Sequence, residues 1–139
     1  MFVSNSTVQY GPELTVNAQS QTPIQGEANV ARYLARLIKP RYEYAPYQHV
    51  GAVDDLLDLA THNIQCGSSK EKASAVRQLN TALGKSEWLS PTGEMSVADA
   101  VVWSALQQAG LSKGAPGNVQ KWLKACEAQS AFQSALAFL

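Results

Sequence analysis

The sequence predicts a mainly α-helical fold, in which a bundle of helices follows a short β-hairpin. Residues 7–10 and 14–17 alternate apolar and polar side chains on either side of the turn signal Gly11-Pro12, as the strands of a hairpin do. The rest of the chain shows apolar residues at helical spacing instead. Two later segments, beginning at Ser68 and Ser96, have the form of a capping box, which starts a helix.

Length, charge and cysteine spacing limit the classes of function. A chain of 139 residues, 45% of them hydrophobic, is the size of one domain with a substantial core. Eleven basic and eleven acidic side chains cancel, so we expect no direct binding of nucleic acid or of anionic lipid. No signal peptide or membrane-spanning run is evident. Cys66 and Cys126 form no C-x-x-C pair, and we expect both to be buried in a protein of the reducing cytosol.

The first expected helix begins at Glu27 and ends before Lys39-Pro40. Arg32 and Arg36 share its polar face, which we expect in solvent. Its apolar face, which we expect in the bundle, consists of Val30, Leu34, Leu37 and Ile38. A second helix follows a loop rich in Tyr and Pro and runs to Gly67. Its inward positions are Val50, Val53, Leu57, Ala60 and Ile64.

The third expected helix starts at the capping box formed by Ser68 and Glu71 and ends at Gly84, which we expect in a left-handed cap. Its inward positions are Ala73, Val76, Leu79 and Leu83. A loop containing Pro and Gly follows, and we expect it to tuck the pair Trp88-Leu89 toward the core.

The fourth expected helix gives the strongest local signal, with Ser96 at the N-cap and Asp99 at the third helical position. Its apolar residues leave little polar face, so we expect it in the centre of the bundle: Val97, Val101, Val102, Ala105, Leu106 and Ala109. A fifth helix from Pro116 or Asn118 to Glu127 has as its inward positions Val119, Trp122, Leu123 and Cys126. The last helix contains Phe132, Leu136 and Leu139.

The capping box in a buried helix, preceded by Trp88-Leu89, resembles the helical C-terminal domain of the glutathione transferase superfamily. Further runs resemble, more narrowly, the glutathione-transferase-like domains that assemble the multi-aminoacyl-tRNA synthetase complex. These runs are residues 67–73, 82–86, 97–99, 106–108 and 118–122, with Cys126-Glu127 after them. The resemblance implies that residues 1–26 are a truncated remnant of the thioredoxin-like half, reduced to a β-hairpin, and that residues 27–139 are the helical domain.

The resemblance also implies that this chain is not an enzyme. Glutathione transferases activate a thiol with a Tyr, Ser or Cys near the start of the thioredoxin-like half, and residues 1–26 offer no counterpart. They hold their ligand with an acidic residue followed by Ser at the N-terminus of the helix that begins here near Glu27. The chain has Gly26-Glu27 instead, which places a carboxylate where that of the ligand would lie. We expect no catalytic residue, no cofactor and no glutathione binding.

Two polar groups leave a choice between a site and an ordinary surface. His62 follows Asp58 by four residues on the second helix, which would suit an acid/base pair, but a surface pair at this spacing is commoner. Asp54, Asp55 and Asp58 form an acidic edge, which would suit a metal ion but is more often a solvated face. We therefore expect neither catalysis nor a metal site.

The resemblance implies two partner-binding faces. Transferase-like domains pair through the helix that begins here at Glu27 and the long helix after it. The outward candidates on these helices are Asn29, Arg32, Tyr33, Arg36, Asp54, Asp58, Thr61, His62 and Gln65. The second face includes Lys121, at a position where similar scaffold domains have an Arg before the Trp. Because Lys lacks the planar guanidinium, the contact is weaker or directed elsewhere.

We therefore expect a non-catalytic scaffold domain of the synthetase complex. The partner that the resemblance favours is the glutathione-transferase-like domain of glutamyl-prolyl-tRNA synthetase, with aspartyl-tRNA synthetase or other members of the complex as further candidates. The resemblance also allows a homodimer of the isolated chain. The alternatives are a fragment of a glutathione-transferase-type enzyme, or the equivalent appended domain of a tRNA synthetase or of an elongation-factor subunit.

Overall fold

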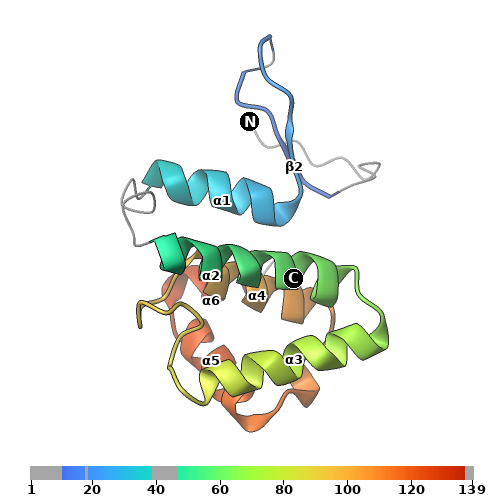
Figure 1. Ribbon diagram of the computed structural model, residues 1–139, viewed down its shortest axis with the longest axis vertical. Coiled ribbons are helices and arrows are strands. Elements are labelled where there is room, and N and C mark those ends of the chain that lie inside the picture. The colour runs from blue at the N-terminus through green and yellow to red at the C-terminus, as the bar shows by residue number, and fades with distance from the viewer. Residues whose placement is uncertain (1–10, 18, 39–46, 137–139) are drawn as a thin grey trace.

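A computed structural model describes residues 11–17, 19–38 and 47–136 of the chain (Figure 1). Its helices follow a two-stranded antiparallel sheet, which confirms the mainly helical class with an N-terminal hairpin. The elements are β1 (Glu13–Leu14), β2 (Ile24–Gln25), α1 (Glu27–Ile38), α2 (Tyr47–Asp58), a π-helix (Leu59–Gln65), α3 (Ser69–Leu83), α4 (Val97–Gln108), a 3-10 turn (Ser112–Gly114), α5 (Gly117–Glu127) and α6 (Ser130–Leu136).

Helix α4 lies at the centre of the bundle, as its sequence predicts. It packs against α1, α2, the π-helix and α5, whereas α3 covers the π-helix and α5. Figure 1 shows α1 along one edge of the bundle, with the hairpin projecting away from it. The inward positions expected for α4 and α5 are confirmed, because the buried residues of these helices include Val101, Val102, Ala105, Leu106, Val119, Trp122, Leu123 and Cys126. Phe132 of α6 is also buried and meets Trp103 edge-to-face, with ring centroids 5.0 Å apart.

The N-terminus of α4 is fixed by a fully buried carboxylate, that of Asp99. Its Oδ2 accepts hydrogen bonds from the backbone amide of Ser96 at 2.9 Å and from the Ser96 hydroxyl at 3.2 Å. Its Oδ1 accepts from the backbone amide of Leu89 at 3.0 Å and from the indole nitrogen of Trp122 at 2.9 Å. The predicted capping box is therefore confirmed, and the same carboxylate joins the 88–89 loop and α5 to α4.

The second predicted capping box, at the start of α3, is also present but lies in solvent. The amide and the hydroxyl of Ser68 donate to the carboxylate of Glu71 at 2.7 and 2.6 Å, and these hydrogen bonds lower the pKa of Glu71. The cap is therefore fully formed above the ordinary carboxyl pKa and weakens as acid protonates Glu71. Gly84 ends α3, but its φ of −72° is right-handed, so the expected left-handed cap is wrong. The amide of Asn118 lies against this position and donates to the carbonyl of Asn80.

The second helix differs from its prediction in its last two turns. It changes at Leu59 from α-helix to π-helix, and the amide of Cys66 bonds to the carbonyl of Thr61, five residues back, at 3.1 Å. The inward positions are nevertheless confirmed, because Val53, Leu57, Ala60 and Ile64 are all buried. A side chain at Gly67 would overlap the carbonyl of Asn63, so the turn that leaves the π-helix needs glycine.

Three expectations about individual positions are wrong. The hairpin pairs Glu13 with Gln25 and Leu14 with Ile24, so the expected strand at 14–17 contributes only its first residue and its partner follows much later. The other expected strand, at 7–10, lies outside the described residues. Ala73 of α3 is exposed, because the side of α3 that faces the core contains Ala75, and Ala73 lies on another side of the helix. Cys66 is exposed as well, whereas Cys126 is buried as expected.

The largest correction concerns α1, because three of the four apolar residues expected to face the bundle are exposed. Leu34, Leu37 and Ile38 are 39%, 61% and 77% exposed. The only buried residue of α1 is Ala28, and Arg32 is half-buried. Ala28 and the partly buried Ala31 pack against the hydrophobic core on this side, and Arg32 and Glu27 bind carboxylate and amide groups of the bundle beside them.

Asp99 provides a test of how the bundle is held together. Replacing Asp99 with Ala is expected to lower the free energy of unfolding by at least about 3 kcal/mol, because buried donors on the 88–89 loop and on α5 lose their charged acceptor. Urea denaturation measures the change. The matched control is Glu71→Ala, which removes the equivalent carboxylate from the exposed capping box and should produce a clearly smaller loss. Equal losses in the two variants would contradict the central role of Asp99.

Candidate partner-binding surfaces

The contact between α1 and α2 is centred on the guanidinium of Arg32. Its Nε lies 2.7 Å from Oδ1 of Asp54, and its terminal nitrogens lie 3.2 Å from Oδ1 of Asp58 and 2.7 Å from Oδ1 of Asn29. The structure thus brings together four of the residues predicted to bind a partner: Asn29, Arg32, Asp54 and Asp58. They bind one another within the chain, and Arg32 reaches from α1 to both carboxylates of α2.

The charges in this cluster are unequally exposed. The side chain of Arg32 is 18% exposed, those of Asp54 and Asp58 35% and 60%. Burial alone would lower the pKa of Arg32, but hydrogen bonds and charge from Asp54 and Asp58 outweigh this effect and raise the pKa above its ordinary value. Arg32 is therefore a fixed cation within the contact, whereas Asp58 keeps most of its surface available to solvent or to another molecule.

A second polar contact attaches the start of α1 to the bundle through Glu27. Its Oε2 accepts hydrogen bonds from Nε2 of Gln65 at 2.9 Å and from Nε2 of Gln108 at 3.3 Å. Gln108 also donates to the hydroxyl of Ser104 at 2.9 Å. Gln65, one of the predicted partner-binding residues, thus orients this carboxylate within the chain. The start of α1 therefore contains a carboxylate that side chains of α4 and the π-helix hold in place.

The remaining predicted residues of this face differ in exposure. Tyr33 is half-buried, whereas Arg36 and His62 are exposed. The hydroxyl of Thr61 donates to the carbonyl of Leu57, within its own helix. Asp58 binds Arg32, and no hydrogen bond joins it to His62 among the described side chains. Nor does the described part of the chain contain three or more His, Cys, Asp or Glu side chains grouped so that they could hold a metal ion.

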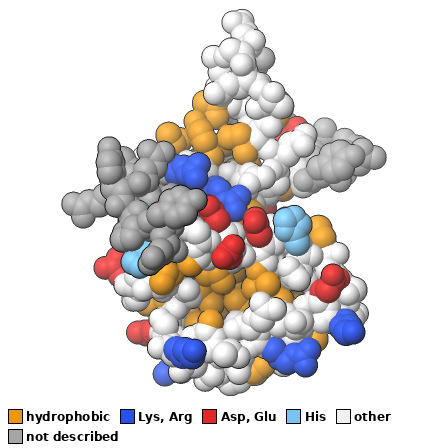
Figure 2. Space-filling model, viewed as in Figure 1, with side chains coloured by type: hydrophobic (Ala, Val, Ile, Leu, Met, Phe, Trp, Pro, Cys, Tyr) orange, Lys and Arg blue, Asp and Glu red, His pale blue; other side chains and the backbone are white. Residues whose placement is uncertain are grey.

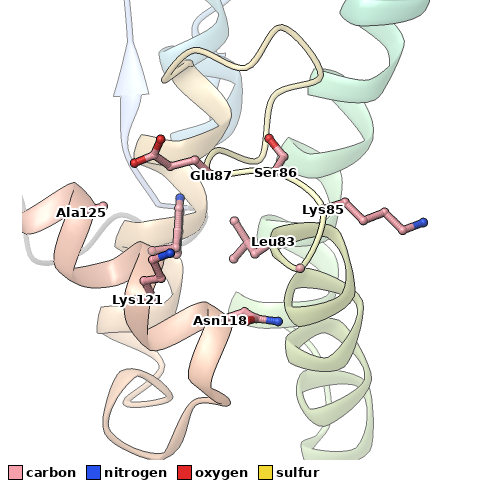
Figure 3. A pocket seen from close by; sticks show the side chains of 9 residues that line it. Leu83, Lys85, Ser86, Glu87, Asn118, Lys121 and Ala125 are labelled. Atoms are coloured by element: carbon pink, nitrogen blue, oxygen red, sulfur yellow. The ribbon is translucent and has the colours of Figure 1, made fainter.

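Lys121 lies at a pocket of about 450 Å³ between the end of α3, the loop after it, and α5. Figure 3 shows Leu83 of α3 and Lys121 of α5 at this opening, with Asn118 below them and Lys85 extending to the side away from α5. The lining residues are Leu83, Gly84, Lys85, Ser86, Glu87, Asn118, Lys121, Trp122 and Ala125. Because Lys85 extends away from α5, the charged groups on the α5 side of the opening are Lys121 and Glu87, and Leu83 and Trp122 add an aliphatic and an aromatic lining.

The pocket also explains what the sequence could not show about this face. Trp122 is 2% exposed and its indole bonds to Asp99, so it belongs to the core, as its helical phase predicts. Lys85 and Glu87 were not anticipated, because nothing in the order of residues places this loop beside α5.

The thiol of Cys126, one turn further along α5, is inert at neutral pH, since burial and the charges of Asp99 and Glu127 raise its pKa to about 12.

An apolar face of α1 was also missed as a surface. Exposed Leu34 and Leu37 are accompanied by half-buried Val30 and Tyr33, at positions i, i+3, i+4 and i+7 of one helix face. Figure 2 shows hydrophobic side chains gathered over α1 at the foot of the hairpin. The amphipathic pattern of α1 is therefore correct, but the pattern does not state which side faces the bundle.

Comparison with known proteins confirms the resemblance to proteins of the synthetase complex. The chain is 44% identical over 128 residues to aminoacyl tRNA synthase complex-interacting multifunctional protein 2 of Rattus norvegicus. The proteins of the same name from Mus musculus and Homo sapiens are 43% and 41% identical over the same length. Each match covers 91% of this chain and 39% of the relative. No protein-family model matches the chain. Among the described residues, no helix has the length and apolarity to cross a bilayer.

The polar attachment of α1 can be tested at Arg32. Replacing Arg32 with Met keeps the aliphatic stem but removes the cation that binds Asp54 and Asp58. Amide hydrogen exchange is expected to become faster in α1 and to stay unchanged in α4, with a global loss of stability below about 1 kcal/mol because the cluster is partly exposed. High salt should accelerate α1 exchange in the parent chain more than in the variant. Arg77→Met on exposed α3 is the control, and equal protection of α1 in all three chains would contradict the attachment.

Proposed function

Because this chain is homologous to part of the complex-interacting multifunctional protein 2, we propose that it is a non-catalytic docking domain that holds aminoacyl-tRNA synthetases together. The observation behind this proposal is the 41–44% identity to relatives with that name over 91% of the chain. These relatives are longer than the chain, so the proposal concerns only what their shared segment does. The cytosol, where translation takes place, is the corresponding location.

The environment of Glu27 supports a role without catalysis. Gln65 and Gln108 hold its carboxylate at the end of α1 where a transferase would bind the charged end of its ligand. A ligand carboxylate brought to this point would meet a like charge that already has two hydrogen-bond donors. The site therefore favours the α1 attachment of this chain and disfavours a tripeptide.

The pocket at Lys121 supports a specific kind of partner. We propose that it receives an acidic side chain from the glutathione-transferase-like domain of glutamyl-prolyl-tRNA synthetase, with aspartyl-tRNA synthetase or another member of the complex as the alternative. Lys121 is exposed on α5 above Leu83 and Trp122, so an incoming carboxylate would gain a cation while its neighbour covers the apolar floor. The exposed groups beside the Arg32 cluster, Asp58 and His62 among them, form the other proposed face.

Mixing the chain with that synthetase domain tests the proposal. A stable heterodimer is expected by light scattering, and Lys121→Glu is expected to weaken it by about tenfold or more, because two carboxylates would then face each other. Lys124→Glu is the matched control, since Lys124 is exposed on the same helix but does not line the pocket. Lys121→Arg should bind at least as tightly as the parent chain.

The result that would contradict the docking role is a mixture that contains only the separate chains at every concentration. If a heterodimer forms but Lys121→Glu and Lys124→Glu weaken it equally, the docking role stands and the pocket is not the contact.

A glutathione titration tests the absence of transferase function. Calorimetry is expected to show no saturable binding up to millimolar glutathione, because Glu27 opposes the ligand carboxylate. The control is Glu27→Gln, which removes this negative charge. It tests whether repulsion by the Glu27 carboxylate is the reason that the parent chain does not bind glutathione. Saturable micromolar binding by the parent chain would favour the alternative of an enzyme fragment.

A further inference from the structure

The fold separates the charges that cancel in the sequence. Residues 69–85 and 112–127, which include α3, the 3-10 turn and α5, contain seven Lys and Arg against two carboxylates. Helices α1 and α2 with the π-helix contain two Arg against four carboxylates. Figure 2 shows Lys and Arg side chains along the lower edge of the molecule, over α3, and Asp and Glu side chains between α1 and α2. The net charge of zero therefore conceals one basic side of the molecule.

The exposed sides of α3 and α5 adjoin on this basic side. The two helices pack against each other, and the side-chain amide of Asn118 donates to the carbonyl of Asn80. Lys70 and Arg77 are two turns apart on α3, about 10 Å along its axis, so they project from the same side of the helix. We call the cations here the basic face; all are exposed except Lys72, which is half-buried. They are Lys70, Lys72, Arg77, Lys85, Lys113, Lys121 and Lys124.

The charge of the basic face is not neutralised by carboxylates of the chain. Among the side chains that the structure describes, the ion pairs are the two that Arg32 makes on the opposite side of the bundle. The two carboxylates within the basic segments have other partners. Glu71 is bound in its capping box, and Glu127 accepts a hydrogen bond from Gln107 at 3.1 Å. The field of the basic face therefore remains available to an anion from outside.

The neutral residues of this face indicate which kind of anion fits. None of the large apolar side chains that are exposed lies on α3, the 3-10 turn or α5, whereas protein interfaces and membrane-surface helices use such side chains. Exposed Gln78 and Gln120 add amide groups that bind phosphate and sugar oxygens. The aromatic residue of these two helices, Trp122, is 2% exposed and offers no surface on which unpaired bases could stack. These features favour the backbone of a nucleic-acid duplex.

We infer that the basic face binds the phosphate backbone of double-helical RNA without reading its base sequence. RNA is favoured over DNA because its 2′-hydroxyl both donates and accepts, as the amides of Gln78 and Gln120 do. Helix α3 has 15 residues and is about 22 Å long, so its cations can meet several phosphates along one duplex. The inference does not depend on the proposed function, because Lys70 and Arg77 lie outside the pocket at Lys121.

Fluorescence anisotropy with a labelled RNA duplex of about 20 base pairs tests the inference. The parent chain is expected to bind with a dissociation constant of roughly 1–100 µM at physiological salt, and more tightly at lower salt. Lys70→Gln and Arg77→Gln are each expected to raise the dissociation constant about threefold or more. Each should also reduce the slope of its logarithm against the logarithm of salt concentration by about 1, because one phosphate contact is lost.

Arg36→Gln is the matched control, because it removes the same charge from an exposed Arg on α1, outside the basic face. It should leave both the affinity and the salt dependence unchanged. Circular dichroism and urea denaturation confirm that the variants remain folded. The heterodimer with the synthetase domain is measured in parallel, and Arg77→Gln is expected to retain it.

Four outcomes would overturn the inference. The first is a parent chain that shows no salt-dependent binding of the RNA duplex, and the second is an Arg36→Gln chain that is weakened as much as Arg77→Gln. The third is equal or tighter binding of a DNA duplex or of phosphatidylserine vesicles, which would assign the basic face to another anion. The fourth is a loss of the heterodimer together with RNA binding in Arg77→Gln, which would assign the face to the protein partner.

Discussion

The buried carboxylate of Asp99 is the interaction on which the bundle depends. It accepts the amides that would otherwise be unpaired at the start of α4, and it also binds the 88–89 loop and the indole of Trp122. Because a buried charge is costly without partners, these donors and the carboxylate require each other. One side chain therefore fixes how α4, the 88–89 loop and α5 are placed relative to one another. The pocket at Lys121 depends on the same contact, since Trp122 is among its lining residues.

The attachment of α1 follows a different physical rule. Arg32 and Glu27 connect α1 to the bundle through ion pairs and side-chain hydrogen bonds, with few buried apolar side chains between the helices. Partly exposed pairs of this kind contribute little stability but are directional, so they define how α1 sits without requiring its apolar face. The apolar face is left outward as a consequence. The polar residues expected to bind a partner thus serve first to position α1.

The two kinds of contact divide the surfaces of the protein. On the α5 side the scaffold is rigid and hydrogen-bonded to a buried charge, which suits a pocket that selects a particular side chain. On the α1 side the attachment is polar and the exposed surface is apolar. The carboxylate of Glu27 is held by the side-chain amides of Gln65 and Gln108, and burial keeps the thiol of Cys126 protonated at neutral pH.

The sequence by itself determined the helical class, the two capping boxes and the inward stripe of every helix that is buried on a broad face, such as α4 and α5. These follow from local hydrogen bonding and from helical periodicity, which involve residues close in the chain. Only the tertiary structure decided which side of α1 faces the bundle, because Arg32 finds its carboxylates on α2 and periodicity cannot identify a partner. It also decided the strand pairing of Leu14 with Ile24 and the meeting of Lys85 with α5, since contacts between distant segments depend on how the helices pack.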